Sequence, residues 1–545
     1  MAALDGIKNS CYGEMGGVGY ATTISQGKNP LGAVAPGALP EEWYVMHFDE
    51  WPVELQTTWK EFEASVIEYG RMLLHQVPAT MKAQVTTFEE IEAVTRQMTQ
   101  TLAQEWTHET VQALEPTTPP TCPTCAIAMR QVDVRALTKL GIFGIYHWHR
   151  AYYVCPAGHG GLAPTDVLLG LGPERFTAAL AQAVTAFAVT LPFDQIPPLM
   201  NTLVDLPLDG DTIRRVAERV GGVAEAAEQA AIAAVTAAMA AEGEEGATET
   251  SAVGGASDAE AARTHSGVAP DALIVSVDAA TAPFQEGHEY HEVKVAVCQP
   301  LQRVSPTPSA SEAPRWQPLQ APDYCLGLEP RPEFWRRVRA HALQHGLGSP
   351  TCRLVALVGD GADWIWRYGA RYLGGLGCYL IAIVDIFHAR EHLWAYARGY
   401  FDTEAAATVW ARPLNARLET DGPGPILDAM AALEAHHPGA HPTTVQEHHQ
   451  YFVHQASRMD YPRYRALGLP LGSGIIEGTC KTLVKERLDG GGMWWTRIGA
   501  PTIGTLRALY RSGRGRQFWA ARPYAATRRP GTDTQSPQAP ASQVA

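Results

Sequence analysis

The sequence predicts a multidomain protein of mixed α+β and α/β class, and three observations support that class. The chain has 545 residues, which is more than a single hydrophobic core normally holds together. In the first half, apolar residues recur at intervals of three and four, which is the spacing of helices. From residue 271 onward, short β-branched runs alternate with helical segments, as they do in an α/β sheet domain.

Changes in composition divide the chain into seven segments. Prolines end the first helical pattern, and a stretch of Gly, Glu, Ala, Ser and Thr separates the helical half from the sheet domain. The first and last segments lack apolar periodicity, so we expect a loose arm and a disordered tail. In order, the segments are an N-terminal arm (1–50), a helical region (51–120) with helices at 51–77 and 87–114, a ribbon (121–165), a second helical region (166–241), a flexible linker (242–270), an α/β domain (271–522) and a tail (523–545).

The α/β domain is predicted from its strands and from a helical insertion at about 390–465, which has a Pro/Gly break at 420–425. The run at 354–358 is interpreted as a strand, and we expect it to lie beside the first strand in the sheet. The predicted strands are 273–277, 292–297, 354–358 and 379–384, and the predicted helices between them are 332–346 and 362–373.

The net charge of −14 argues against general attraction to DNA, but the charge is unevenly placed. Residues 222–271 carry nine acidic side chains and one basic one, whereas residues 481–530 carry eleven basic side chains and two acidic ones. The basic stretch favours a local phosphate-binding surface, and a solvated face is the alternative. Nine cysteines without a dense framework, no signal-peptide pattern and no apolar run of about 18 residues favour a cytoplasmic protein without a membrane partner.

Three cysteines and a histidine have the spacing of a zinc ribbon. Cys122 and Cys125 form a Cys-x-x-Cys knuckle, and Cys155 and His159 follow a β-like segment. Two knuckles at hairpin ends can hold Zn²⁺ tetrahedrally through thiolate and imidazole ligands, although Gly158 stands where a fourth cysteine is expected. The alternatives are unpaired cysteines on a loop-rich element, or a redox pair, for which no thioredoxin-like strand is present.

A short basic helix after a Gly-containing turn is a candidate for DNA recognition. Asp211 or Thr212 can cap its N-terminus, and Gly221 can end it. Its arginines lie off the apolar stripe, as in the recognition helix of a helix-turn-helix, and an amphipathic core helix is the main alternative. The stripe consists of Ile213, Val216, Ala217 and Val220, and the arginines are Arg214, Arg215 and Arg219.

Acidic residues stand at the ends of predicted strands and at the start of a late helix. Asp278 and Asp360 each follow a β-branched run, and Glu477 opens a stretch with helical spacing. Carboxylates on such rigid elements can hold two Mg²⁺ or Mn²⁺ ions, which serve in-line phosphoryl transfer. A strand-end aspartate is also a common turn residue or helix cap, and Asp360 can cap the helix at 362–373.

Asp385 is a rival for the second metal-ligand position, and His388 lies three residues further on. Asp385 follows the strand predicted at 379–384. Asp360 follows the run at 354–358, which is the expected neighbour of the first strand at 273–277. The predicted strand order therefore favours Asp360 for the second metal-ligand position.

The helix that begins near Glu477 carries the bases closest to these acids. Lys481 and Lys485 lie one and two helical turns after Glu477, within reach of phosphate oxygens. A glycine hinge and paired Trp residues follow, which can stack on nucleobases, wedge a DNA end or simply pack in the core. The candidate DNA-binding residues of this region are Lys481, Lys485, Arg487, Trp494, Trp495 and Arg497.

Three blocks that occur in the same order make most of the chain similar to a known family. They are 359–366 (GDGADWIW), 384–394 (VDIFHAREHLW) and 472–477 (GSGIIE), the last continuing to KTLVKER and GMWW. From about Cys122 to Trp519 the chain resembles insertion-sequence transposases of the ISKra type, within the Mutator-like group of DDE transposases.

The resemblance implies an RNase H-like catalytic domain with a helical insertion before the glutamate. It implies that Asp278, Asp360 and Glu477 bind two Mg²⁺ or Mn²⁺ ions, and that Asp385 and His388 form an accessory Asp-x-x-His signature outside this triad. It also implies an upstream helix-turn-helix for terminal inverted repeats. The chain departs from the family pattern after Asp278, where it reads Ala-Ala-Thr, and at 290–294, where it reads YHEVK.

We therefore expect a bacterial, nucleoid-associated transposase that cuts the ends of its element and joins them to target DNA. Its partners would be double-stranded DNA, at the terminal inverted repeats and at the target, and further copies of the chain when two ends are paired. The alternatives are an RNase H-like nuclease without strand transfer and a DNA-binding regulator that has lost catalysis.

Overall fold

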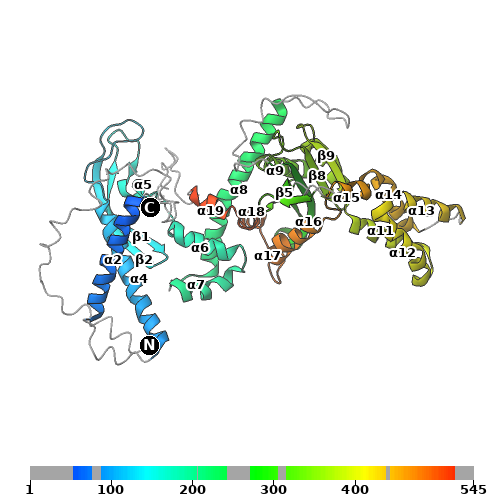
Figure 1. Cartoon of the computed structure of the whole chain (residues 1–545). Helices are drawn as coiled ribbons and strands as arrows, with labels where there is room; N and C mark the ends of the chain where they lie inside the picture. Colours follow the sequence, from blue (N-terminus) through cyan, green and yellow to red (C-terminus); the bar gives the residue numbers. More distant parts are fainter. Residues whose placement is uncertain are drawn as a thin grey trace, which may run out of the picture. The chain divides into compact units, whose positions relative to one another are not determined.

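The computed structural model describes residues 53–75, 87–172, 174–204, 206–241, 270–304, 315–436 and 442–521. The predicted arm (1–50), the linker up to residue 269 and the tail (523–545) lie outside these residues. The described elements combine helices with two β-sheets, so the predicted mixed α and β class is confirmed (Figure 1). The chain divides into a unit that ends at Gln97 and a unit that begins at Met98.

Two long helices form where helices at 51–77 and 87–114 were predicted. Helix α2 covers Val53–His75 and helix α4 covers Phe88–Ala113. The hydroxyl of Thr87 accepts a hydrogen bond from the N–H of Glu90 at 3.2 Å, and the N–H of Thr87 donates to the Glu90 carboxylate at 3.0 Å. This reciprocal capping box satisfies two otherwise unpaired donors and fixes the start of α4.

The predicted ribbon is a small antiparallel sheet. Strands β1 (Arg130–Gly141) and β2 (Gly144–Val154) form a hairpin, and the short strand β3 (Gly161–Leu162) pairs with the end of β2. Gly144 has φ of 124°, a conformation that favours glycine and lets the hairpin turn within two residues. The short helix α5 (Pro164–Leu168) follows.

The second helical region contains α6 (Ala178–Ala188), the 3₁₀ turn η3 (Phe193–Gln195), α7 (Ile196–Val204) and α8 (Gly210–Ala241). The N-cap of α8 is Asp209, whose carboxylate accepts the N–H of Thr212 at 2.7 Å, so the expectation of a cap at Asp211 or Thr212 was wrong. The apolar stripe of this helix is buried as predicted.

Gly221 does not end α8, because the helix continues for twenty more residues to Ala241. At this glycine α8 packs against α18 (Gly499–Arg511), and a Cβ atom here would lie 2.5 Å from the carbonyl oxygen of Thr502. The absence of a side chain therefore permits a close helix crossing and does not mark a C-cap, a distinction that only the tertiary contact reveals.

We expect Gly221→Ala to destabilise the protein by about 1–3 kcal/mol, because the added methyl group forces α8 and α18 apart. Gly222→Ala is the matched control, since a Cβ atom at Gly222 meets no atom within 4 Å. Replacing this glycine should stabilise the helix by up to about 1 kcal/mol. Urea unfolding of both variants checks the pair, and equal effects of the two substitutions would contradict the close crossing.

The larger sheet has six strands in the order β6-β5-β4-β8-β9, with β7 also paired to β5. β5 runs antiparallel to β4, whereas β8 and β9 are parallel to it, so the expected contact between the strands predicted at 273–277 and 354–358 is confirmed. The strands β6 and β7 were not predicted. The bounds are β4 (Ala272–Phe284), β5 (Glu289–Val304), β6 (Arg315–Pro318), β7 (Asp323–Gly327), β8 (Leu354–Gly359) and β9 (Tyr379–Val384).

Helices flank this sheet and form an insertion after β9 (Figure 1). The flanking helices α9 (Arg331–Gln344) and α10 (Asp363–Leu373) match their predictions, and the predicted break at 420–425 separates two insertion helices. The insertion contains α11 (Ile386–Tyr400), α12 (Glu404–Asp421), α13 (Gly424–His436), α14 (Thr443–Gln455) and α15 (Tyr461–Ala466), and the chain then forms α16 (Gly474–Thr479), the π-helix η6 (Cys480–Lys485), α17 (Glu486–Leu488), α18 and α19 (Gly515–Ala520).

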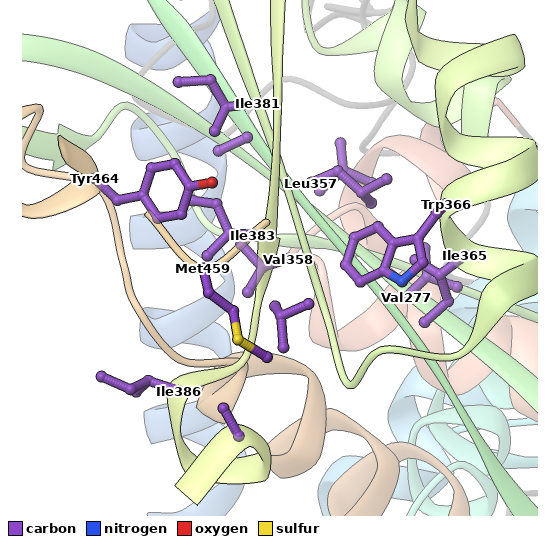
Figure 2. Packing of buried hydrophobic residues seen from close by; sticks show 14 of the residues in the cluster. Val277, Leu357, Val358, Ile365, Trp366, Ile381, Ile383, Ile386, Met459 and Tyr464 are labelled. Atoms are coloured by element: carbon purple, nitrogen blue, oxygen red, sulfur yellow. The ribbon is translucent and has the colours of Figure 1, made fainter. Parts of the chain in front are cut away.

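An apolar core lies directly beneath the ends of the central strands (Figure 2). Val277 immediately precedes Asp278, and Ile386 immediately follows Asp385, and both apolar side chains are buried in this core. Met459, from the end of the insertion, belongs to the same cluster. Because protein interiors are densely packed, the two aspartates are attached to backbone that has little freedom to move.

A buried ion cluster joins α8 to the sheet domain. Arg337 of α9 is buried, and its guanidinium lies 2.7 Å from Glu225 and 2.7 Å from Glu329, with Glu228 at 3.6 Å. His341, one turn further along α9, lies 2.6 Å from Glu228. Three carboxylates thus surround one inaccessible arginine, two of them contributed by α8.

The cluster continues to β7 through Asp323, which lies 2.5 Å from the second ring nitrogen of His341. Burial opposes protonation of this histidine, but the charges of Glu228 and Asp323 outweigh it and raise the pKa of His341 to about 9. Arg514 also contacts Asp323, at 3.0 Å. A member of the basic stretch 481–530 is therefore part of the interior ion cluster.

Among the described helices, α8 has the length and composition to cross a membrane, and α6 together with the segment Phe193–Val204 would be a second candidate if this bent pair formed one span. Glu225 and Glu228 of α8 take part in the ion cluster, and this helix packs against α6, α9 and α18.

Candidate active site and metal centres

Three aspartates belong to three neighbouring strands: Asp278 lies within β4, and Asp360 and Asp385 immediately follow β8 and β9. The parallel register of β4 and β8 pairs Ser276 with Val358, so Asp278 lies beside Asp360 two residues further on. The register of β8 with β9 then places Asp385 beside Asp360. Parallel strands place their carboxyl ends at one edge of a sheet, so the three aspartates stand in a row along that edge.

The row carries unbalanced negative charge. Burial and the neighbouring charge of Asp360 raise the pKa of Asp278 above its ordinary value, despite a hydrogen bond from the N–H of Ala279. Asp360 accepts the N–H of Ala362 at 2.9 Å, so it also fixes the turn before α10. The Asp360 side chain therefore fixes a local turn, as the alternative interpretation predicted, and also belongs to the charged site.

Asp385 connects this row to Glu477. The Asp385 carboxylate is buried and accepts the N–H of Ser473 at 2.7 Å, the hydroxyl of Ser473, and the N–H of Phe387 at 2.5 Å. The Ser473 hydroxyl also lies 3.2 Å from the Glu477 carboxylate. Since Ser473 immediately precedes α16, these bonds fix the start of the helix that carries Glu477.

His388 completes this second group of side chains. Its Nδ1 atom lies 3.7 Å from the Asp385 carboxylate, and one donor atom from each of Asp385, His388 and Glu477 lies within 4.8 Å of the others. The Asp385 interaction raises the pKa of His388 to about 9, although burial opposes it. Burial raises the pKa of Asp385, but the nearby His388 ring and the hydrogen bonds from Ser473 and Phe387 outweigh it and hold that pKa well below the usual range.

A second contact ties the Glu477 helix to the first strand. The thiol of Cys480 donates to the Asp278 carboxylate at 3.6 Å. Cys480 begins the π-helical turn η6, which interrupts the α-helical repeat between Glu477 and Lys485. Single π-turns of this kind are frequent at functional sites, where they change the direction of side chains along one helix.

Helix α14 of the insertion contacts the loop that carries Asp360. The hydroxyl of Tyr451 donates to the carbonyl of Asp360 at 2.9 Å, and the Gln455 amide donates to the carbonyl of Gly361 at 2.8 Å. Gly361 has φ of 111°, and a Cβ atom there would lie 2.7 Å from the Tyr451 ring. Only glycine fits this position, which helix α14 holds in place.

The structure brings the predicted acids together in two contacts. Asp278 lies beside Asp360, and Glu477 lies with Asp385 and His388. Asp385, expected outside the triad, belongs to the second contact, whereas Asp278, Asp360 and Glu477 do not form a group whose donor atoms all lie within 4.8 Å of one another. Sequence reasoning assigned no role to Ser473, although it lies within the GSGIIE block, nor to Cys480, which lies three residues after Glu477.

The predicted zinc ligands form a separate cluster in the ribbon. The donor atoms of Cys122, Cys125, Cys155 and His159 all lie within 4.8 Å of one another. The sulfur atoms of Cys125 and Cys155 are 3.6 Å apart, and the Nδ1 atom of His159 lies 3.6 Å from the sulfur of Cys155. Tetrahedral Zn²⁺ with bonds of about 2.0–2.3 Å requires ligand separations of about 3.5–3.8 Å, so the donor set fits this ion.

The local backbone favours thiolate at Cys122, whereas at Cys125 a backbone hydrogen bond is outweighed by burial and the neighbouring sulfur atoms, which raise the pKa of that thiol. Burial raises the pKa of Cys122, but backbone N–H groups of Thr124 and Cys125 outweigh it and lower the pKa to about 6. Thiolate is the form that binds metals, so these N–H groups favour metal binding. His159 supplies the position that a fourth cysteine would otherwise occupy, as the spacing predicted.

We expect purified protein to carry one tightly bound Zn²⁺ that is lost in Cys155→Ser, because three ligands bind zinc far more weakly than four. Cys378→Ser is the control, since Cys378 belongs to the other sheet domain and lies outside this cluster. Elemental analysis after dialysis checks the result. Equal zinc content in both variants would contradict the assignment.

The arginines proposed for DNA recognition are partly exposed on α8 and paired with acids. Arg214 contacts Asp211 at 2.6 Å and Glu218 at 2.7 Å. Arg215 lies 3.2 Å from Asp211, and Arg219 contacts Glu174, which precedes α6, at 3.1 Å. Phosphate contact by these side chains would therefore require exchange of surface ion pairs, which are weak interactions.

The basic stretch after Glu477 is not a single exposed face. Arg487 is buried between the rings of Phe193 and Trp495, at 4.8 and 4.9 Å, and donates to the carbonyl of Ala188. Burial lowers the pKa of Arg487 to about 10. Arg487 of α17 and Trp495, which follows that helix, are therefore buried against α6 and η3. Their burial corrects their interpretation as DNA-binding residues.

The remaining candidates of this stretch lie at the surface. Lys481 is exposed, and Lys485 donates to the carbonyl and hydroxyl oxygens of Thr281 and contacts Asp489. Trp494 and Arg497 are exposed at the tip of the β4–β5 hairpin. A basic surface here is thus smaller than the charge count suggested.

A scan of protein-family models finds no match to this sequence, and a search of curated proteins finds none either.

Proposed function

We propose that this chain is a DDE transposase of the ISKra type, which cuts DNA at the ends of its element and joins those ends to target DNA. One observation carries the proposal. Asp278, Asp360 and Asp385 form a row across β4, β8 and β9, and Ser473 connects the end of that row to Glu477. Such a group of carboxylates on rigid elements suits metal-dependent phosphoryl transfer.

The arrangement of the sheet supports the RNase H-like part of the proposal. An antiparallel strand, β5, flanks β4 on one side, and the parallel strands β8 and β9 flank it on the other. A helical insertion then separates β9 from the helix that carries Glu477. The family resemblance leads us to expect this order of strands, insertion and glutamate.

Mg²⁺ or Mn²⁺ suits this donor set, because the ligands are hard carboxylate oxygens. Burial, and then the charge of Asp360, raise the pKa of Asp278, and a bound cation would stabilise its charged form. When bound, two such ions would neutralise the transferring phosphate and stabilise its attacking and leaving oxygens. In our proposal Asp278, Asp360 and Glu477 hold the ions. Asp385 acts through Ser473, because it fixes the start of α16 and thereby the direction of Glu477.

The reaction consists of two displacements at phosphorus. In the first, a water oxygen forms a bond to the scissile phosphorus and the 3′ oxygen leaves, which yields a 3′-OH end. In the second, that 3′-OH attacks a phosphate of target DNA, and a target 3′ oxygen leaves. His388, protonated at neutral pH, can donate a hydrogen bond to a phosphate oxygen beside the carboxylates.

A single assay separates this proposal from its alternatives. A labelled DNA fragment that ends at the inverted repeat beside this reading frame is offered, pre-cut or uncut, with plasmid target and Mg²⁺. A transposase joins the pre-cut end to the plasmid, an RNase H-like nuclease only cuts, and a regulator only binds. We expect joining, and the absence of any joined product would overturn the proposal.

A further inference from the structure

The adjacent residues Trp494 and Trp495 differ in burial: Trp495 is buried, whereas the ring of Trp494 is exposed. Trp495 is 6% exposed, and its indole N–H donates to the carbonyl of Leu488 at 2.9 Å. Its backbone N–H donates to Pro283 at 3.1 Å, and its carbonyl accepts the N–H of Gln285 at 2.9 Å. Trp494 is 39% exposed, although these hydrogen bonds fix the position of the adjacent Trp495.

The tip of the β4–β5 hairpin surrounds Trp494 with two further aromatic rings. The His288 ring lies 5.0 Å from the Trp494 ring at 79°, and the Tyr290 ring lies 6.4 Å away at 63°. Gln285 fixes the backbone of Trp494 through its side-chain amide, which donates to the Trp494 carbonyl at 2.9 Å. Tyr290 is 58% exposed, so two adjoining aromatic side chains face solvent.

The turn that carries His288 has an unusual backbone conformation. Gly287 and His288 have φ of 77° and 50°, and consecutive left-handed residues place the His288 ring against Trp494. A non-glycine residue adopts this conformation only where the surrounding structure determines it. The aromatic group His288, Tyr290 and Trp494, hereafter the aromatic corner, is thus a preformed feature of the hairpin.

We propose that the aromatic corner binds a nucleobase that has been lifted out of the DNA stack. Rings at steep angles to one another can contact a base on its face and at its edge, whereas a base inside a duplex has both faces covered by its neighbours. The acids Glu286 and Glu289 at the same tip disfavour phosphate, so recognition falls on the uncharged base. This inference rests on the proposed function only in taking DNA as the ligand.

The position of the corner relates it to the proposed active site. Pro283, which pairs with Tyr290, lies five residues beyond Asp278 along β4, which corresponds to about 17 Å of extended strand. A DNA strand that runs along β4 rises about 3.4 Å per base, so on such a path the captured base would lie about five positions from the scissile phosphate. Arg497, on the same tip, contacts His291 and can approach the backbone of that strand.

Binding of full-length protein to a labelled oligothymidine, measured by fluorescence anisotropy in EDTA, tests the inference without cleavage. An abasic strand of the same length keeps the phosphates and removes the bases. Wild-type protein should bind oligothymidine more tightly than the abasic strand. Trp494→Ala should weaken oligothymidine binding about 5- to 100-fold and leave abasic binding unchanged, while Trp494→Phe should retain most affinity.

Tyr379→Ala is the matched control, because Tyr379 is an exposed aromatic residue at the start of β9, away from the hairpin tip. It should bind both strands as the wild type does. The inference is overturned if wild type binds the two strands equally, or if Trp494→Ala loses both strands alike or neither. Failure of the proposed function is a separate result, namely wild-type protein that neither cuts nor joins DNA with Mg²⁺.

Discussion

Asp360→Asn should lower the rate of Mg²⁺-dependent DNA cleavage by at least about 10³-fold, because losing a metal-ligand charge removes several kcal/mol of transition-state stabilisation. The asparagine keeps the side-chain oxygen that accepts the N–H of Ala362, so the turn before α10 remains formed. Removing one negative charge beside Asp278 also lowers the pKa of Asp278 toward its ordinary value. The loss is therefore expected in catalysis and not in folding.

Asp363→Asn provides the matched control for this variant. Asp363 lies three residues further on, is exposed, and occupies the first turn of α10, so its substitution removes the same charge outside the carboxylate row. Single-turnover cleavage of labelled DNA should proceed at close to the wild-type rate. A comparable loss in both variants would show that general charge, and not the row of acids, governs the reaction.

Arg337→Met should reduce the free energy of unfolding by about 3–5 kcal/mol, which is the cost of leaving buried charges without their partner. Arg337 is 1% exposed and contacts Glu225 and Glu329 at 2.7 Å. Methionine fills part of the volume but leaves these carboxylates without their counter-charge. Since Glu225 belongs to α8, we expect this helix to lose its attachment to α9 first.

Arg336→Met tests the specificity of that effect at the adjacent position. The Arg336 side chain is more exposed, and its contact with Glu333 is 3.6 Å long, so its loss should cost no more than about 1 kcal/mol. Urea-unfolding midpoints, converted with a common slope, give both values. An equal and small effect of the two substitutions would refute the role of the ion cluster in holding α8.

The strands of the candidate site could be predicted because their signals are local. The β-branched runs before Asp278 and Asp360 make buried strands almost independently of context, and parallel strands place their ends at one edge of a sheet. The row of carboxylates follows from this register. Asp385 was predicted as a rival for the second metal-ligand position. Its connection to Glu477 through Ser473 was not predicted.

The remaining features depend on tertiary contacts that no local pattern encodes. Gly221 looks like a helix stop, yet its place against α18 decides its role. Arg487 and Trp495 look like surface residues of a basic stretch, yet α6 and η3 cover them. The bond between Ser473 and Asp385 joins residues 88 positions apart in the chain, so their sequence spacing could not reveal it.

The number of Mn²⁺ ions bound in the presence of pre-cut end DNA tests the central claim most directly, and electron paramagnetic resonance can count them. The account predicts two ions in the wild-type protein, and fewer ions with unchanged DNA binding in Asp278→Ala and in Glu477→Ala. Two bound ions in both variants, or joining of DNA by the wild type in EDTA, would contradict it.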